Sequence, residues 1–269
     1  MDIQAYLGNP DERPLDRIVD DGGFASLFRT FACVGDSLSS GEFETLDGKG
    51  GRSYHDLFEY SWGQYMARAM GSKAYNFSRG GMTAKVYMES FADDMGFWAR
   101  DKACQAYIMA LGANDISMSL RDGLPFGGME DIRPDWHDNA KTFAGYFGAI
   151  IQRYKGISPD AKFFLITMPT DPDRAAERVP LEEEQCRLMY AMAAHFENTY
   201  VIDLRKYAPV YDRAFKYNFY MNGHLNPCGY ILTAKMVMSY MDYIIRHNMD
   251  DFREAGLIGT PFVNVRESK

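Results

Sequence analysis

Short apolar segments alternate along the chain with longer helix-like segments. The apolar segments predict five buried strands, at about 31–34, 74–77, 106–111, 163–168 and 200–204. Continuous apolar strands are typical of parallel sheets that are covered on both faces. Helices are expected between them, at about 54–70, 83–97, 139–154, 181–196 and 227–247, with Ser53 as a cap, Gly71 as a stop and Pro227 at a helix start.

This order of strands and helices predicts an α/β fold with a mostly parallel, five-stranded central sheet and helices on both faces. No repeat or linker divides the chain, so residues 31–269 are expected to form a single domain, on which an N-terminal extension, residues 1–30, packs. Functional groups of such folds lie on the loops beyond the carboxyl ends of the strands. The segments that follow each strand are therefore the ones to search for chemistry.

Composition narrows the classes of protein. The 269 residues are 46% hydrophobic and 25% charged, as in ordinary globular proteins. A net charge of −8 repels phosphate backbones, so nucleic acid is not an expected partner. No apolar run reaches the length of a membrane span, and the polar N-terminus lacks the features of a signal peptide, so a cytoplasmic location is expected. Nothing in the sequence predicts an oligomeric state.

The four cysteines are far apart in the sequence and form no CxxC pair. Cys33, Cys104, Cys186 and Cys228 are expected to be free, buried thiols. No cysteine or histidine neighbours have the spacing of a zinc site, so neither a metal nor another cofactor is expected.

Four segments outside the predicted strands carry candidate catalytic groups. They contain Ser37 in Gly35-Asp36-Ser37, the glycine pair that ends in Gly81, Asn114, and His224 just before the last helix. Each segment alone could be no more than a capped turn. Together they supply a nucleophile, a base and donors for an oxyanion at one edge of the sheet, which are the requirements of acyl transfer.

In their order and spacing these segments resemble the conserved blocks of the SGNH hydrolase superfamily, the GDSL esterases and lipases. The matching residues are Gly35-Asp36-Ser37, then Asn76, Gly81 and Thr83, then Gly112, Asn114 and Asp115, and finally His224. The resemblance covers about residues 31–247 and implies a flavodoxin-like three-layer α/β/α sandwich. It also implies Ser37 as nucleophile, His224 as general base, and an oxyanion hole of the Ser37 and Gly81 N–H groups and the Asn114 side chain. Asp36 and Asp115 are interpreted as structural, accepting backbone N–H bonds.

One departure concerns the group that orients the base. The family usually has an aspartate three residues before the histidine, and this chain has Met221 there. A backbone carbonyl from residues 220–222 is the favoured substitute, and the side chains of Asn222, Asp212 and Asp203 are the alternatives.

The function that follows is ester hydrolysis through an acyl-enzyme. Two loops, 41–52 and 116–137, are expected to shape the pocket, and Trp136 or Tyr220 could stack on a sugar ring. We expect a short-chain acyl ester as substrate, such as an acetyl group on a carbohydrate. Two alternatives remain open: a lysophospholipase or acyl-thioesterase with the same site, and a degenerate member that binds ligands without turnover.

Overall fold

A five-stranded parallel sheet forms the centre of the protein in the computed structural model, which describes residues 3–9 and 11–264. Its strand order is β4-β1-β5-β6-β7. Every neighbouring pair is parallel. The strands are β1 (Thr30–Gly35), β4 (Lys73–Ser78), β5 (Ala106–Ala110), β6 (Lys162–Ile166) and β7 (Thr199–Ile202). The predicted α/β class and the five predicted strands are confirmed.

Helices connect the strands and cover the sheet. The longer ones are α3 (Trp62–Met70), α6 (Ala113–Asp122), α7 (Phe143–Ile157), α8 (Val179–His195) and α11 (Pro227–His247). Short helices are α1 (Gln4–Leu7), α2 (Ser37–Ser40), α4 (Ala84–Val86), α5 (Ala92–Asp94), α9 (Leu204–Tyr207), α10 (Arg213–Phe219) and α12 (Met249–Phe252). A π-helical stretch, Tyr87–Phe91, joins α4 to α5.

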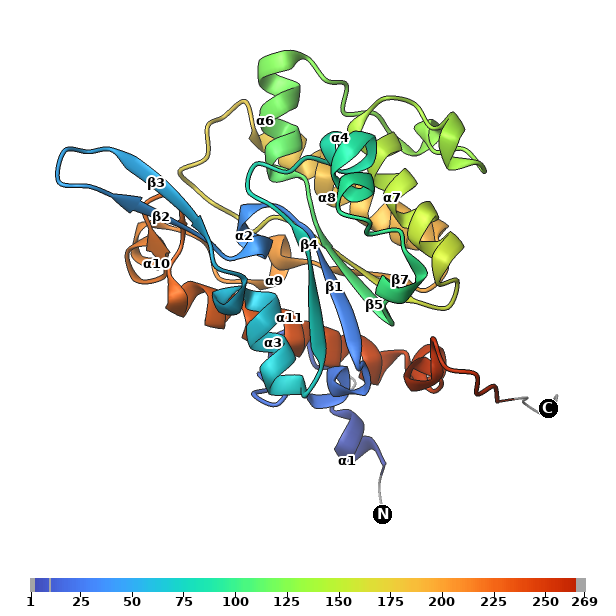
Figure 1. Ribbon diagram of the computed structural model, residues 1–269. Coiled ribbons are helices and arrows are strands. Elements are labelled where there is room, and N and C mark those ends of the chain that lie inside the picture. The colour runs from blue at the N-terminus through green and yellow to red at the C-terminus, as the bar shows by residue number, and fades with distance from the viewer. Residues whose placement is uncertain (1–2, 10, 265–269) are drawn as a thin grey trace.

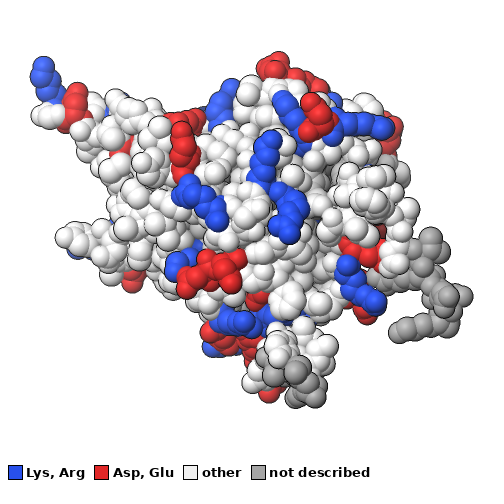
Figure 2. Space-filling view, turned by 60° about the horizontal axis from the view of Figure 1, so that its bottom comes forward, with Lys and Arg blue, Asp and Glu red and all other residues white. Residues whose placement is uncertain are grey.

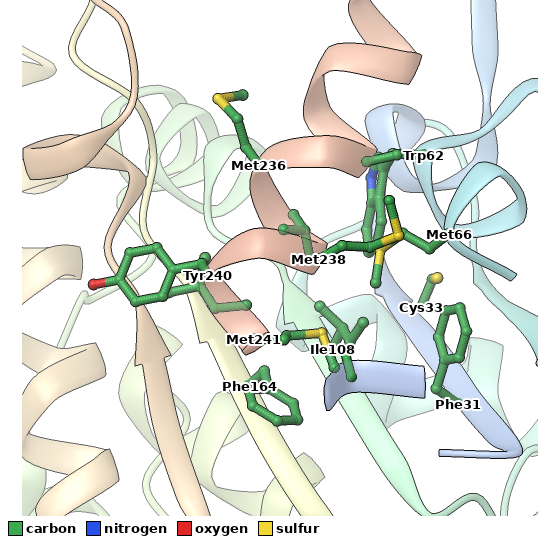
Figure 3. Packing of buried hydrophobic residues seen from close by; sticks show 14 of the residues in the cluster. Phe31, Cys33, Trp62, Met66, Ile108, Phe164, Met236, Met238, Tyr240 and Met241 are labelled. Carbon is green, nitrogen blue, oxygen red and sulfur yellow. The ribbon is translucent and has the colours of Figure 1, made fainter. Parts of the chain in front are cut away.

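The sheet separates two apolar layers, because successive strand residues point to opposite faces. On β1, Phe31 and Cys33 pack with α3 and α11, whereas Ala32 and Val34 pack on the other side with α7 and α8. Figure 3 shows the first layer, in which methionines of α11 meet Trp62 of α3 above the strands. The helices therefore lie on both faces, as in a three-layer sandwich (Figure 1).

The segment before α3 differs from the prediction. The expected helix over 54–70 begins only at Trp62, with Ser61 rather than Ser53 as its cap, and ends before Gly71 as expected. Residues before it form an antiparallel hairpin of β2 (Glu42–Leu46) and β3 (Arg52–Asp56). All side chains of β3 are exposed, so no apolar periodicity marked it as a strand. The hairpin projects from the carboxyl edge of the sheet, at the end of the molecule away from both termini (Figure 1).

Residues before β1 lie against α11. The 3₁₀ turn Gly23–Leu27 packs on this helix, where Phe24 N–H donates to Asp242 Oδ1 at 2.8 Å. Arg246, whose side chain is 1% exposed, bridges Asp242 at 2.7 Å and Glu12 at 2.8 Å. A charge buried this deeply needs both partners, because an unpaired buried charge is strongly destabilising.

The cysteines and the charged surface residues differ in how far they match the expectations. The four cysteines are free, but Cys228 is exposed and Cys186 half-buried, contrary to the expectation that all are buried. On the face that Figure 2 shows, acidic and basic side chains are interspersed without a continuous patch of either sign. Within residues 3–9 and 11–264, no helix combines the length and hydropathy needed to cross a bilayer.

Candidate active site

The predicted nucleophile lies at the turn from β1 into α2. Asp36 caps this helix by accepting a hydrogen bond from Leu38 N–H at 3.1 Å, which confirms its structural interpretation. A side chain at Gly35 would collide with Ser39, so the turn requires glycine there. Ser37 is the first residue of α2, and its N–H is among those that a helix leaves without an internal partner. It is therefore open to an acceptor outside the helix.

The second and third predicted segments are bound to each other. Gly81 has φ of +71°, a conformation that favours glycine, and Thr83 caps α4. Asn114 Nδ2 donates to Met82 O at 3.2 Å, and Ala84 N–H donates to Asp115 Oδ1 at 2.8 Å. The latter bond confirms that Asp115 accepts a backbone N–H. These two bonds hold the Gly81 turn beside the start of α6.

His224 lies on a second small hairpin, formed by β8 (Tyr220–Met221) and β9 (His224–Leu225). Met221 pairs with His224 across it, and Asn222 in the turn has φ of +58°, a left-handed conformation that asparagine tolerates better than most residues. Asn226 then caps α11 by accepting from Gly229 N–H at 2.9 Å, and Pro227 opens that helix as expected.

The structure brings the predicted nucleophile, amide donor and base together. Ser37, Asn114 and His224 line one cleft of about 380 Å³. The other lining residues are Asp36, Leu38, Ala113, Asp171, Arg174, Lys216, Tyr220, Asn222 and Gly223. Gly81 is not among them, but its neighbour Met82 accepts the hydrogen bond from Asn114. The four sequence segments thus meet at the carboxyl edge of the sheet.

Two glutamates that the sequence analysis missed flank His224. Glu44 Oε2 lies 3.3 Å from His224 Nδ1, and Glu42 Oε1 lies 3.1 Å from His224 Nε2. Both belong to β2, the strand inside the segment that was predicted as a pocket loop. The alternation Glu42-Phe43-Glu44 was the available signal, because it places both carboxylates on the same face of a strand.

The side-chain alternatives for orienting His224 make other contacts. Asp203 Oδ1 accepts from Thr167 at 2.9 Å, and its Oδ2 accepts from Tyr190 at 2.7 Å. Asp212 caps α10 through Phe215 N–H at 2.8 Å. Among the residues that the structure describes, the polar contacts of the His224 ring go to Glu42 and Glu44 instead.

The side chain of Asn222 also makes a different contact. Its Nδ2 donates to the backbone oxygen of Glu44 at 2.8 Å. Asn222 therefore fastens the two hairpins to each other rather than contacting the imidazole.

Burial perturbs the carboxyl groups of this region. It raises the pKa of Asp36 to about 6 and that of Asp115 to about 7, against the opposing effect of their backbone hydrogen bonds. Burial also raises the pKa of Glu42. For Glu44 burial acts in the same direction, but the bonds from Gly223 and His224 and the charge of Arg52 outweigh it and hold its pKa below the usual value.

A smaller apolar chamber adjoins the cleft. Its volume is about 110 Å³, and it shares Asp36, Leu38, Ala113, Arg174 and Tyr220 with the cleft. Its remaining walls are mostly apolar, from Trp62, Ala110, Ile166, Met168, Pro169, Leu204, Tyr211 and Leu225. The chamber lies between the turn at Asp36, the strand ends at Ala110 and Ile166, and Thr233 of α11.

The predicted aromatic and loop contributors have different places. Tyr220 lines both the cleft and the chamber. Trp136 stacks on His137, with ring centroids 3.6 Å apart, and lines a separate surface groove that shares no residue with the cleft. Residues 116–137 do not line the cleft at all. In the described part of the chain, no three histidine, cysteine or acidic side chains are grouped as metal ligands would be.

Comparison with known families gives a match over most of the chain. The model of the GDSL-like Lipase/Acylhydrolase family matches residues 33–232, which contain all four predicted segments. A search of curated proteins gave no match.

Solved structures of similar fold include several esterases. A family two carbohydrate esterase from Clostridium thermocellum, in complex with cellohexaose, is 14% identical with a TM-score of 0.56, over 83% of this chain and 65% of that one. One from Corynascus thermopiles (Myceliophthora fergusii), which also has a carbohydrate-binding domain, is 15% identical with a TM-score of 0.54, over 80% and 66%. An acetyl xylan esterase is 16% identical with a TM-score of 0.50, over 78% and 98%. At such identities the likeness shows the fold.

Proposed function

Because the chain belongs to the GDSL-like lipase/acylhydrolase family, we propose that it is a serine ester hydrolase that acts on short-chain acyl esters through an acyl-enzyme. The observation that carries this proposal is the convergence of Ser37, Asn114 and His224, from three distant segments, on one cleft. A nucleophile, a base and an amide donor in one cleft are the groups that acyl transfer needs.

The proposed reaction proceeds in two halves. Ser37 Oγ attacks the ester carbonyl carbon while His224 Nε2 takes the serine proton, and the carbonyl π electrons move to oxygen. The oxyanion accepts from the N–H groups of Ser37 and Gly81 and from Asn114 Nδ2. Collapse expels the alkoxide, which takes the proton from His224 and leaves as the alcohol. Water then repeats the sequence on the acyl-enzyme and releases the acid.

The contacts of two groups must change before this chemistry can start. His224 Nε2 lies 3.1 Å from Glu42 Oε1. Asn114 Nδ2 donates to Met82 O at 3.2 Å and to Asp36 Oδ2 at 3.4 Å, so both of its hydrogens are engaged. The proposed reaction needs His224 Nε2 to accept the serine proton and Asn114 Nδ2 to donate to the oxyanion. We therefore expect substrate to displace these partners.

The adjoining chamber supports a short acyl group. About 110 Å³ of mostly apolar space accommodates a few carbons but not a long fatty acyl chain. This favours short esters over lysophospholipids and long-chain thioesters, which would need an extended apolar groove. The carbohydrate esterases among the structural neighbours add support for an O-acetylated sugar as the alcohol part of the substrate.

A chain-length series tests this function. p-Nitrophenyl esters from acetate to dodecanoate should be cleaved with kcat/KM highest at two to four carbons, and Ser37→Ala should abolish the activity. His224→Ala should lower it as strongly, whereas the matched control His55→Ala, on the exposed strand β3, should leave it unchanged. A maximum at eight or more carbons would favour the lipid or thioester alternative, and absence of Ser37-dependent activity would favour the binding protein.

A variant of the chamber tests the acyl assignment separately. Ala110 lines the chamber, so Ala110→Leu should fill part of it. The ratio of kcat/KM for butyrate to that for acetate should fall by at least fivefold, because the longer acyl group loses its space. An unchanged ratio, in a variant that melts like the wild type, would show that the acyl group lies elsewhere.

A further inference from the structure

The acid that usually orients the histidine in this family is absent from its position in this sequence. A general base must carry its proton on the nitrogen away from the nucleophile, and a carboxylate at that nitrogen fixes the tautomer and stabilises the imidazolium. Met221, at the family's position for this acid, has no oxygen to accept the proton. We infer that Glu44, on the β2–β3 hairpin, is the residue that orients His224.

The contacts of Glu44 suit this positioning role. Its Oε2 lies 3.3 Å from His224 Nδ1 and also accepts from Gly223 N–H at 2.9 Å. Its Oε1 accepts from Arg52 Nη1 at 2.7 Å. The side chain is 2% exposed, so the carboxylate is held among these donors with little access to water. Both oxygens are thus satisfied, and one of them faces the imidazole.

The two hairpins are also joined through the backbone. Asn222 Nδ2 donates to the Glu44 carbonyl at 2.8 Å. The next residue in the turn, Gly223, donates its N–H to the Glu44 carboxylate. At the start of β2, Tyr230 of α11 donates to the Glu42 carbonyl at 2.7 Å. β2 is therefore fixed at two points, beside His224 and on α11. Glu44 is therefore already held in place to orient His224.

Glu42 is the competing candidate, and its place argues against it. It lies at His224 Nε2, the nitrogen that must receive the proton of Ser37, so a carboxylate there opposes the reaction instead of supporting it. Its carboxylate also approaches Gly80 so closely that a side chain at that position would collide with it. Glu42 thus lies over the turn that presents Gly81, and it must move when substrate enters.

The inference rests on the proposed function, and the test separates the two. Kcat and KM are measured for Glu44→Gln, Glu42→Gln and the wild type with the best short ester, together with the pH profile of kcat/KM. Glutamine keeps the size of Glu44 but has one acceptor oxygen in place of two. If this oxygen accepts from Arg52, the change removes both the charge and the acceptor at His224 Nδ1. We expect kcat to fall on the order of 10³–10⁴-fold with KM changed less than threefold.

The pH profile is a readout that a merely structural role would not move. The groups facing His224 are Glu42 and Glu44 from β2, Tyr54 from β3, and Asp36 through its charge. Loss of the Glu44 charge destabilises the imidazolium, so the rise of kcat/KM with pH should shift to lower pH in Glu44→Gln. In Glu42→Gln, kcat should stay above a tenth of the wild-type value.

Returning the acid to the family's position provides a rescue. Adding Met221→Asp to Glu44→Gln should restore kcat by at least tenfold, because Met221 pairs with His224 across the hairpin. Should Glu44→Gln fail to fold, Glu44→Asp replaces it, and a loss in kcat below twofold would then overturn the inference. A Ser37-dependent wild type together with a Glu44→Gln variant within tenfold of it, and with an unshifted profile, would also overturn it. Wild-type activity that survives Ser37→Ala would instead overturn the proposed function.

Discussion

Replacing Asp115 by asparagine should make the protein's stability less sensitive to pH. Asp115 is 0% exposed. Its Oδ1 accepts from Ala84 N–H at 2.8 Å, and its Oδ2 has no hydrogen-bond partner among the described residues. Burial raises its pKa from 3.8 to about 7, with the nearby charge of Asp36 adding to the shift. Asparagine can keep the bond to Ala84 but cannot ionise.

The sign and size of the effect follow from proton linkage. Between the two pKa values the folded protein holds a proton that the unfolded chain has released, so the free energy of unfolding falls as pH rises. The fall ends near pH 7, where the folded group also ionises. From pH 5 to pH 8 it amounts to about two pKa units, or about 2–3 kcal/mol at 1.36 kcal/mol per unit. In Asp115→Asn this fall in the free energy of unfolding does not occur, because asparagine does not ionise.

Urea unfolding followed by tryptophan fluorescence measures the difference. The free energy of unfolding of Asp115→Asn relative to the wild type should rise by about 2–3 kcal/mol between pH 5 and pH 8. The asparagine amide group that lacks a hydrogen-bond partner lowers the free energy of unfolding equally at pH 5 and pH 8. This contribution therefore cancels when the two pH values are compared. A difference between the two proteins that stays constant over this range would refute the reasoning, because it would show that burial does not perturb the ionisation of Asp115.

Further outcomes follow from the placement of single side chains. Asn114→Ala should lower turnover on the order of 10²-fold with the fold intact, since it removes an oxyanion donor; a raised KM alone would make Asn114 a substrate-binding residue. Asp203→Asn and Asp212→Asn should each keep at least a tenth of turnover, as should Asn222→Ala, and a loss of 10³-fold at either aspartate would place it in the catalytic machinery. A thiol reagent under native conditions should modify Cys228 first, as mass mapping would show; faster reaction at another cysteine would contradict its exposure.

The central sheet could be predicted from the sequence because most of its strands are covered on both faces. β1, β5 and β6 each contain a short, continuous apolar segment, whereas β4 begins at exposed Lys73 and includes Asn76. The nucleophile, Asn114 and His224 follow from motifs at fixed places beside the strands. Such local signals survive without knowledge of the rest of the fold. The same holds for the last helix, which Pro227 opens and which ends at His247 as expected.

The hairpin could not be recognised in the same way. β3 is exposed along its whole length, so its sequence shows no alternation of apolar and polar residues. Glu44 is buried only because Arg52, Gly223 and His224 converge on it, two of them from a segment about 180 residues away. A charge buried by long-range partners looks like a surface charge in the sequence. From the sequence, the available partners for the base are therefore residues near His224 and acids at strand or helix ends.

The packing of α11 decides how the protein can be shortened. The family match ends at residue 232, inside this helix, whereas Val237, Met241 and Ile245 lie in the core beyond that point. An expression fragment cut at the limits of the match would lose this apolar surface. A fragment begun at β1 would also strip Glu12 from the buried Arg246. Recombinant fragments for crystallisation should accordingly keep the residues from Glu12 through α12 (Met249–Phe252), although the catalytic motifs occupy a much shorter stretch.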